Sequence, residues 1–512
     1  MATGINLQPK VVNGLLTLDL SNRGLTFIPP QVFHLVDLEK LVLSKNFLTS
    51  IPAEIGALRK LQVLVVDDNS LSYVHQRIIT LVNLGYLSVQ RNQLAKMPNG
   101  LSNLRALHGL FIRGNRFTEV PEEVCSLLNL QWLGVGDNPI RHLPENIIQL
   151  TRLKILSITG CMLDEFPQQV LQMQALEELF MGSRGLSSIP DKVLKQKHIQ
   201  CLILRDNKIK KISKKISKFD YLLTLDVSNN PDLKFIPRQI GKLPKLYNLH
   251  LENCGLESLP DELYNLHTLG SLNLKGNKLS ALSTEITKLQ SLKQLFIDNN
   301  QFMEFPEEIC ALANLEVLGC GQNPLTRLPD KLTILNLKSL TISCCRFEEF
   351  PRQVLSLGGL ERLYMGGWAG SNTHSPVPEG IAHLQNLRLL AVDQSELSHL
   401  PESIIHLQLL QELDLSMNLF TAVPQVVFTL PSLLALYMVG NQLTRLPVEL
   451  GRLPVLEDIA VFDNPLEYPP EDICKEGSDA IIDFLRAEDA RVVPLEGEMG
   501  AQGHHPTPTT EL

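Results

Sequence analysis

One pattern, LxxLxLxxNxL, returns along almost the whole chain and constrains its fold more than any other feature. Clear copies are LEKLVLSKNFL from Leu38 and LQVLVVDDNSL from Leu61. Aligned on its first apolar residue, the pattern starts twenty times between Leu15 and Leu456, and most starts are equally spaced with a period of twenty-three. Twenty copies at one period do not arise by chance, so the sequence predicts a stack of repeated coils.

The period changes at three places only. One residue is added at 230–233, one is missing at 330–337, and four are added after the coil that starts at Leu360. The pattern resumes in phase after each change. We therefore expect one repeat domain, although chain length alone would suggest about three or four globular domains.

The pattern also predicts where the side chains of one coil point. The LxL part is a short strand with alternating side chains, so positions 1, 4 and 6 enter the core. Asn at position 9 can satisfy buried backbone groups of adjacent coils with both ends of its amide. We expect an asparagine ladder of Asn46, Asn69, Asn92, Asn115, Asn138 and Asn207, with the thiols of Cys161, Cys254 and Cys345 in the same place.

A second phrase follows each copy, as in TSIPAEIGAL and TRLPVELGRL. Its proline fixes φ and lacks a donor, which suits a short irregular return better than a long helix. A single coil buries too little apolar surface to stand alone, whereas stacked coils share hydrogen bonds and one core. The predicted fold class is an α/β repeat solenoid of about twenty coils with a parallel β-sheet on its concave side.

The two ends of the chain depart from the repeat. After Pro470 an amphipathic turn and helix place Ile473, Ile481, Phe484 and Leu485 toward the stack, which caps it. The last residues are rich in Gly, Pro, Thr and His and are expected to be disordered. The predicted segments are a lead-in at 1–14, the repeat array at 15–466, a cap at 467–486 and a tail at 487–512.

Cysteine usage and the N-terminus indicate the compartment. The nine cysteines are scattered singly apart from Cys344–Cys345, and neither end of the array has a cysteine cluster. The N-terminus has no apolar signal region, and no uninterrupted apolar stretch could span a membrane. These features favour a reduced, cytoplasmic location and predict no membrane span.

The coil can be compared with known families. With its LPxxIxxL phrase it resembles the Ras-suppressor and Scribble group of intracellular leucine-rich repeat scaffolds. The closing NPLEYPPEDICKEGSDAIIDFL is similar to the end of the repeat array in chordate leucine-rich repeat signalling proteins. The repeats as a whole resemble those of the expanded family of such proteins in lancelets. The resemblance covers residues 15 to 486. It implies a right-handed leucine-rich repeat arc and, by analogy with the Ras-suppressor group, a small GTPase as partner. No signalling domain follows the cap, so no effector activity is carried over.

Enzyme signatures are missing from the sequence. It contains no GxxxxGK[ST], no HExxH and no paired CxxC. GVGDNP at Gly134 and GCGQNP at Gly319 fall on a strand and its turn, with no helix N-terminus to receive a phosphate. We expect no catalytic residue, no cofactor and no metal. The net charge of −9 argues against nucleic acid as a partner.

Recognition must then use positions 3, 5, 7 and 8, which face outward from the concave sheet. Large aromatics mixed with charged residues at these positions are typical of protein interfaces. Alternatively, single aromatics only cover neighbouring strands. The predicted partner-binding residues are Phe111, Arg113, Trp132, Phe180, Tyr247, His250, Phe296, Arg362, Tyr364, Trp368, Tyr437 and Phe462.

Two longer features concern this face. The stretch from Phe111 is repeated from Phe296, eight coils later, which indicates a block duplication or two related binding patches. The insertion in MGGWAGSNTHSPVPEG lies beside Tyr364. Residues 368–376 are either a tolerated surface loop or a recognition loop anchored by Trp368.

Two features lie away from this face. KIKKISKKISK, from Lys208, forms a solvated edge or a site for an acidic partner or anionic lipid. The final TTEL, with Thr510 and Leu512, matches the carboxyl-terminal motif that PDZ domains bind by strand addition.

Together these features predict a non-enzymatic intracellular scaffold or recognition protein in signal transduction that binds a protein on its concave face. The alternative is an immune-type recognition receptor ectodomain. A third class, an enzyme with a cryptic site, has no residue to nominate.

Overall fold

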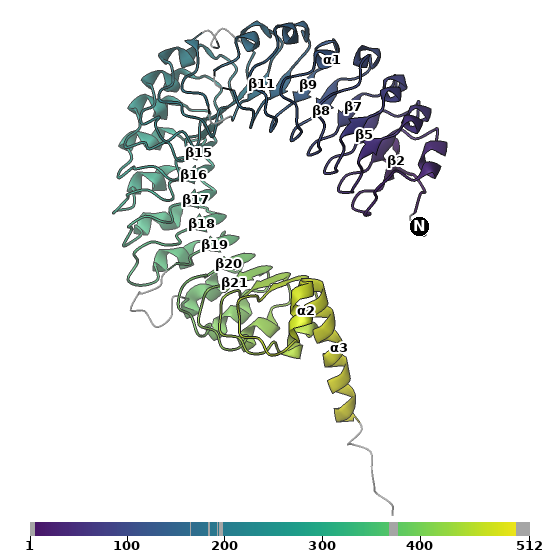
Figure 1. Cartoon of the computed structure of the whole chain (residues 1–512). Coiled ribbons are helices and arrows are strands. Elements are labelled where there is room, and N and C mark those ends of the chain that lie inside the picture. Colours follow the sequence, from purple (N-terminus) through teal and green to yellow (C-terminus); the bar gives the residue numbers. More distant parts are fainter. Residues whose placement is uncertain are drawn as a thin grey trace, which may run out of the picture. The chain divides into compact units, whose positions relative to one another are not determined.

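Each copy of the repeated pattern forms a short strand in the computed structural model, which describes residues 6–163, 165–182, 185–191, 193, 198–367 and 377–497 (Figure 1). The chain divides into two units, Met1–Lys278 and Leu279–Leu512. In each unit the strands line one side and short helices line the other. The predicted repeat solenoid with a parallel sheet is confirmed.

The first unit begins with an antiparallel pair. β1 (Lys10–Val12) lies in the predicted lead-in and pairs with β2 (Leu15–Asp19), and every later strand of this sheet pairs in parallel with the strand before it. The later strands are β3 (Lys40–Val42), β5 (Val63–Val65), β7 (Tyr86–Ser88), β8 (Gly109–Phe111), β9 (Trp132–Gly134), β10 (Ile155–Ser157), β11 (Glu178–Phe180), β12 (Cys201–Ile203), β13 (Thr224–Asp226), β14 (Asn248–His250) and β15 (Ser271–Asn273). A separate parallel pair joins β4 (Ser50–Ile51) to β6 (Tyr73–Val74).

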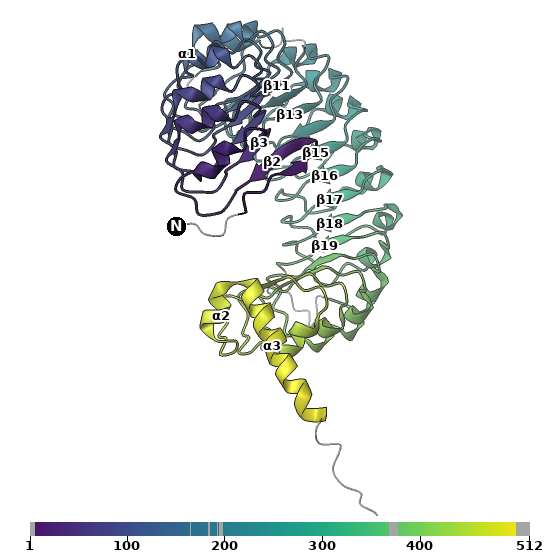
Figure 2. The ribbon, with the colours of Figure 1, turned by 90° about the vertical axis from the view of Figure 1, so that its right-hand side faces the viewer.

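The second unit continues the same order of strands. They are β16 (Gln294–Phe296), β17 (Val317–Gly319), β18 (Ser339–Thr341), β19 (Arg362–Tyr364), β20 (Leu389–Ala391), β21 (Glu412–Asp414), β22 (Ala435–Tyr437) and β23 (Asp458–Ala460). Figure 2 shows β16 to β19 one after another along the chain. All pairs in this unit are parallel.

The register confirms the repeat alignment, irregular steps included. Leu41 pairs with Leu64, as the regular period predicts. At the three places where the sequence period changes, the pairs are Leu225 with Leu249, Leu318 with Leu340 and Leu363 with Leu390. In the three-residue strands of the coils the middle residue points into the core, as Leu110 at 0% and Leu133 at 1% exposure show. The stack absorbs extra residues outside the strands and keeps its core column unchanged.

The return segments are short, as the prolines predicted. Most begin directly after the proline of the second phrase, for example after Pro52 and Pro144. In the first unit they are η1 (Pro30–His34), η2 (Ala53–Ala57), η3 (Gln76–Thr80), η4 (Leu101–Asn103), α1 (Glu122–Cys125), η5 (Glu145–Gln149), η6 (Gln168–Gln172), η8 (Lys214–Lys218), η9 (Arg238–Lys242) and η10 (Asp261–Asn265). In the second they are η11 (Thr284–Lys288), η12 (Glu307–Ala311), η13 (Asp330–Ile334), η14 (Arg352–Ser356), η15 (Glu379–His383), η16 (Glu402–His406), η17 (Gln425–Thr429) and η18 (Val448–Arg452).

The asparagine ladder is present. Asn92 donates from Nδ2 to the carbonyl of Val66 in the preceding coil (2.9 Å) and to that of Val89 (3.1 Å), and its Oδ1 accepts from the backbone of Leu71 (2.9 Å). The predicted cysteines take the same place, since the thiol of Cys254 donates to the carbonyl of Val227 at 3.2 Å. Each buried turn thus satisfies backbone groups of the coil before it.

The C-terminal cap is two helices, α2 (Glu471–Glu476) and α3 (Ser478–Gly497), beside the last coil. Ile481 and Leu485 are buried as predicted, whereas Ile473 and Phe484 are half-buried. α3 continues beyond residue 486, where the sequence placed the start of the tail. An ion pair between Arg452 and Asp489 (2.7 Å) ties this extension to the stack. Residues 498–512, with Thr510 and Leu512, lie outside the described residues.

Candidate functional site

Three aromatic side chains gather on the outward face of β7, β8 and β9. Tyr86 begins β7, Phe111 ends β8 and Trp132 begins β9. The register places Gly109 between Tyr86 and Trp132, and Gly134 beside Phe111. The rings of Tyr86 and Phe111 are 5.1 Å apart between centroids, which is contact distance for aromatic rings. We call Tyr86, Phe111 and Trp132 the aromatic cluster.

The two glycines explain why the rings lie where they do. A Cβ atom on Gly109 would lie 3.0 Å from Cδ2 of Tyr86 and 3.1 Å from Cε3 of Trp132. A Cβ atom on Gly134 would lie 2.9 Å from Cδ1 of Phe111. Because glycine leaves this space empty, the rings pack against the backbone of the neighbouring strand. All three remain half-buried, so part of each ring is open to a ligand.

His108 extends the cluster toward the start of the strands. Its ring lies 5.2 Å from that of Trp132 at 76°, an edge-to-face contact. Another glycine supports it, since a Cβ atom on Gly85 would lie 2.6 Å from Cε1 of His108. The aromatic rings therefore pack against glycines of the neighbouring strands, and the rings of His108 and Trp132 also contact each other.

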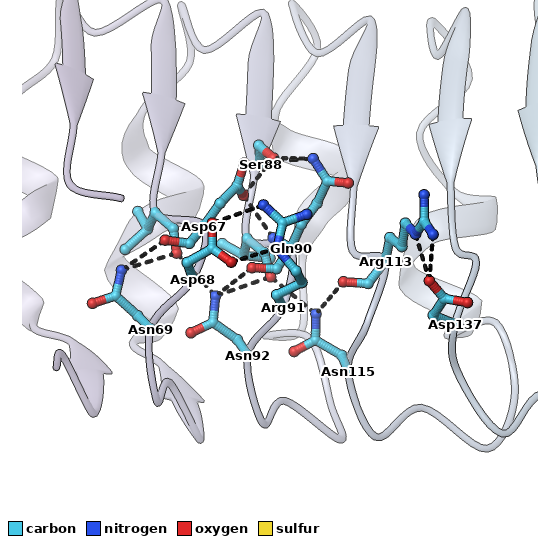
Figure 3. Close-up of polar contacts among 12 residues, drawn as sticks. Asp67, Asp68, Asn69, Ser88, Gln90, Arg91, Asn92, Arg113, Asn115 and Asp137 are labelled. Carbon is cyan, nitrogen blue, oxygen red and sulfur yellow. Dashed lines mark hydrogen bonds and ion pairs between the residues drawn. The ribbon is translucent and has the colours of Figure 1, made fainter. Parts of the chain in front are cut away.

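Polar groups form a border just beyond the ends of β5, β7, β8 and β9, and Figure 3 shows their contacts. Asp67 accepts from the hydroxyl of Ser88 (2.6 Å) and from the backbone N–H of Gln90 (2.7 Å). Burial, followed by the charge of Asp67, raises the pKa of Tyr86, which keeps this phenol protonated at neutral pH. A protonated phenol can donate a hydrogen bond to a ligand.

Two ion pairs lie farther along the same border (Figure 3). Nη2 of Arg91 donates to Oδ2 of Asp68 (2.7 Å), and Nε of Arg113 donates to Oδ2 of Asp137 (2.6 Å). The hydrogen bond from Arg91 lowers the pKa of Asp68 despite some opposing burial. Arg113 and Asp137 also line a hollow that reaches Asp206 and Lys208. The face therefore offers apolar rings beside charges of both signs.

Most of the other predicted site residues lie on the strands of their own coils, whereas Arg113, Tyr247 and Phe462 lie just outside a strand. Apart from the cluster, the half-buried ones are Phe180, His250, Phe296, Tyr364 and Tyr437. The more exposed ones are Arg113, Tyr247, Arg362 and Phe462. Tyr247 precedes β14 and Phe462 follows β23, so both flank the sheet. Trp368 and the insertion at 368–376 lie outside the described residues.

The predicted residues are only partly brought together. Phe111, Trp132 and Arg113 belong to one neighbourhood, whereas Phe296, Tyr364 and Tyr437 lie on strands of the second unit. Tyr437 has a structural partner, because its hydroxyl donates to Asp458 at 3.0 Å. Tyr86 and His108 were not among the predicted residues. Tyr86 could have been found from the sequence, because the coils before and after Gly109 both carry an aromatic residue, Tyr86 and Trp132, at the position equivalent to this glycine.

The cysteines serve the stack. All nine are free thiols, and Cys125, Cys161, Cys254, Cys310, Cys320 and Cys345 are buried. Burial raises the pKa of Cys161 to about 11 and that of Cys254 to about 12. A protonated, buried thiol is a poor nucleophile. The glycine-rich stretches are structural too: Gly134 and Gly319 end strands, and Asn138 and Asn323 belong to the ladder.

Comparison with known proteins gives matches along much of the chain. A family model described as a leucine-rich repeat region matches residues 101–192 and 337–476, and a leucine-rich repeat model matches 13–71 and 244–302. The plant intracellular Ras-group-related LRR protein 7 of Oryza sativa subsp. japonica is 48% identical over 50 residues. That alignment spans 10% of this chain and 19% of the rice protein.

Solved structures share the architecture. A leucine-rich repeat protein of Leptospira interrogans superposes with a TM-score of 0.53 at 28% identity, covering 78% of this chain and 90% of that one. The ectodomain of the Arabidopsis thaliana receptor kinase GASSHO1/SCHENGEN3, in complex with CASPARIAN STRIP INTEGRITY FACTOR 2, gives 0.55 at 27%, covering 90% and 60%. TLR13 in complex with ssRNA13 gives 0.57 at 19%, covering 88% and 76%, a likeness of fold alone. No helix among the described residues is both long and apolar enough to cross a bilayer.

Proposed function

The chain is a leucine-rich repeat protein, and from that premise we propose that it is a non-enzymatic binding protein whose protein partner docks on the aromatic cluster. The observation that carries this proposal is the packing of Tyr86, Phe111 and Trp132 over Gly109 and Gly134. The core of the stack would be served as well by small side chains at these outward positions. Large rings there supply apolar surface for a ligand.

The arrangement suits a binding site energetically. Tyr and Trp are the residues that most often dominate protein interfaces, and rings already held in place lose little conformational entropy on binding. The ion pairs Arg91–Asp68 and Arg113–Asp137 border the rings. Bordering charges of this kind orient a partner and speed its association. Within the first unit, Phe180, Tyr247 and His250 extend the proposed contact along the sheet. On the second unit we propose separate contacts at Phe296, Arg362, Tyr364, Tyr437 and Phe462.

The finer proposal is an intracellular scaffold in signal transduction, located in the cytoplasm, with a small GTPase as partner. The short match to the rice Ras-group-related protein supports the analogy. The ladder thiols support a reducing compartment, because Cys161, Cys254 and Cys345 donate hydrogen bonds that oxidation would remove. We retain a PDZ domain as a second partner for Thr510 and Leu512.

A receptor ectodomain is the second candidate. The likeness to the GASSHO1/SCHENGEN3 ectodomain supports it, since that protein is a leucine-rich repeat ectodomain in complex with CASPARIAN STRIP INTEGRITY FACTOR 2. Stability of the protein in a reducing buffer and its recovery in the cytosolic fraction would favour the scaffold. Secretion of the native protein would favour the receptor.

The proposal is tested by partner capture with matched variants. Immobilised wild type, Phe111→Ala/Trp132→Ala and Phe47→Ala are compared in cytosolic extract by quantitative mass spectrometry. Phe47 is a suitable control because it is 64% exposed and lies in neither a strand nor a helix. A partner retained by wild type and Phe47→Ala is then purified, and its Kd is measured with GDP or a GTP analogue present if it is a GTPase.

We expect the double variant to bind roughly 30-fold more weakly, the loss of about 2 kcal/mol typical of an interface hot spot. Its melting temperature should stay nearly unchanged, because the rings lie outside the core. Equal capture by all three proteins would refute the proposed site.

A further inference from the structure

The two coils that contain β12 and β13 carry a concentration of positive charge on the side opposite the strands. Residues 208–245 include ten Lys and Arg and three Asp, a net charge of +7 in a chain whose total is −9. All ten basic side chains are exposed. They are Lys208, Lys210, Lys211, Lys214, Lys215, Lys218, Lys234, Arg238, Lys242 and Lys245. We call the nine basic side chains from Lys210 to Lys245, with Tyr221 and Phe235 among them, the basic surface. Lys208 is left out because it lines the hollow beside Arg113 and Asp137.

Several of these basic residues occupy equivalent positions in the two coils. Because of the residue added at 230–233, the step between equivalent positions of these two coils is one longer than the regular period. Lys214 and Lys218 begin and end η8, and Arg238 and Lys242 begin and end η9. The same step matches Lys210 with Lys234. It also matches Tyr221 with Lys245, whose Nζ lies 4.2 Å from the centre of the tyrosine ring.

Elsewhere the equivalent positions of neighbouring coils bring opposite charges together. Lys60 pairs with Asp37 at 2.7 Å, and Lys154 pairs with Glu177 at 3.1 Å. On the basic surface, the described ion pairs join Lys215 to Asp191 (2.5 Å) and Arg238 to Glu262 (3.7 Å), both on coils outside the pair. At three pairs of equivalent positions, both coils carry a basic residue: Lys210 and Lys234, Lys214 and Arg238, and Lys218 and Lys242. Such an arrangement repels itself and is relieved by an anionic ligand.

Exposed aromatic rings lie among the lysines. Phe235 is 70% exposed, follows Lys234 directly and takes the position equivalent to Lys211. Tyr221 is 47% exposed at the other end of the return segment. An acidic peptide would be bound by the charges alone. Aromatic rings beside lysines suit the lipid headgroup region, where rings sit at the interface and cations meet lipid phosphates.

We propose that the basic surface binds an anionic phospholipid bilayer, with the lysines on the headgroups and Phe235 and Tyr221 at the depth of the headgroups. The strands of the same coils lie on the opposite side (Figure 1). A membrane on the basic surface therefore leaves the aromatic cluster free for a protein. This inference does not depend on the proposed partner.

The test is cosedimentation with vesicles of phosphatidylcholine alone or with about 30% phosphatidylserine, a PS-rich composition, at about 0.1 M salt. The patch variant replaces four basic-surface lysines by glutamine, and the control variant makes the same change in charge elsewhere. The patch variant is Lys210→Gln/Lys211→Gln/Lys218→Gln/Lys242→Gln. The control is Lys10→Gln/Lys96→Gln/Lys275→Gln/Lys278→Gln, all at exposed positions.

We expect wild type to bind only the vesicles with phosphatidylserine, and to be released as salt rises. The patch variant should bind at least about tenfold more weakly and the control within about twofold, since each lysine near the surface adds to the attraction. Phe235→Ser should weaken binding severalfold without a change in charge. Both quadruple variants should melt like wild type.

Two outcomes would overturn the inference. One is equal vesicle binding by the patch and control variants. The other is binding of wild type to polyglutamate but not to the vesicles, which would assign the surface to an acidic protein. Retained partner binding by the patch variant separates this result from a failure of the proposed function.

Discussion

The stretches from Phe111 to Asn138 and from Phe296 to Asn323 are duplicates in sequence, yet they present different surfaces. Both end a strand with phenylalanine, and in both the next strand ends with glycine, Gly134 or Gly319. In both, the asparagine donates to three carbonyls. The features that the stack needs have been kept.

The outward positions differ between these two stretches, which we call, with their strands β8–β9 and β16–β17, the first and the second block. Trp132 corresponds to Val317, Gly109 to Gln294 and Arg113 to Asp298. In the second block the carboxylate of Asp298 occupies the space over Gly319, where a Cβ atom would lie 2.1 Å from Oδ2, and it accepts from the backbone of Gly321 at 3.0 Å. The first block is aromatic, and the second is polar and acidic at the same place. Stacking fixes the inward side chains and leaves the outward ones free to take on separate roles.

The largest expected effect tests what the blocks share. Asn138→Ala and Asn323→Ala each leave several buried backbone groups without a partner, and each asparagine is only 2% exposed. We expect each change to cost about 3 kcal/mol of stability, measured by urea denaturation. The two costs should agree within about 1 kcal/mol. A clear difference would mean that the ladder is not equivalent in the two blocks.

The next prediction exchanges a residue that differs. Gly109→Gln introduces the residue of the second block under the rings of Tyr86 and Trp132, so the rings must move. We expect partner binding to weaken roughly 30-fold, measured by calorimetry. The reciprocal Gln294→Gly should leave binding unchanged and cost at most about 1 kcal/mol of stability. Unchanged binding by Gly109→Gln would show that the support of the rings is irrelevant.

The ladder thiols give a smaller, pH-dependent effect. Cys161 and Cys345 take the ladder position one coil after Asn138 and Asn323, so they are counterparts. Burial raises the pKa of Cys161 from 9.0 to about 11 and that of Cys345 to about 12. Because the folded pKa is the higher one, the stabilisation is complete below pH 9 and is lost as pH rises toward the folded value. For Cys161 the loss at pH 10 is about 1.4 kcal/mol.

The measurement is the stability difference between wild type and Cys161→Asn, followed by urea denaturation from pH 8 to pH 10. Asparagine keeps the ladder and removes the titrating group, so the difference isolates the thiol. Cys345→Asn should show the same trend over a wider pH range. A difference independent of pH would mean that these thiols are not buried donors.

The sequence predicted the repeat in detail because one physical requirement decides it. A buried column of leucines can keep its register only if each strand meets the next at equivalent positions. Alignment of the pattern, with the one residue missing at 330–337, therefore gives Leu318 beside Leu340. The ladder role of Cys161 followed from position 9 in the same way. The strand register and the ladder position depend only on which residue of the adjacent coil is equivalent, and the sequence pattern gives that directly.

The candidate site was predicted less completely. Phe111 and Trp132 stand out as large residues at outward positions, but Tyr86 and His108 matter through contacts across strands, over Gly109 and Gly85. The end of α3 was also missed, because the contact that ties it down, Arg452 to Asp489, joins residues far apart in sequence. Side-chain pairing across coils is decided by packing, which a linear pattern does not contain.

The most direct measurement is the partner affinity of Trp132→Val beside that of Val317→Trp, because this pair exchanges the residue that most distinguishes the two blocks. We expect the Kd to rise roughly tenfold for the first variant, less than for the double variant Phe111→Ala/Trp132→Ala, and to stay unchanged for the second. Both should melt within a few degrees of wild type. Wild-type affinity in Trp132→Val, or a large loss of its stability, would contradict the claim that the outward rings recognise the partner while the inward leucines hold the stack.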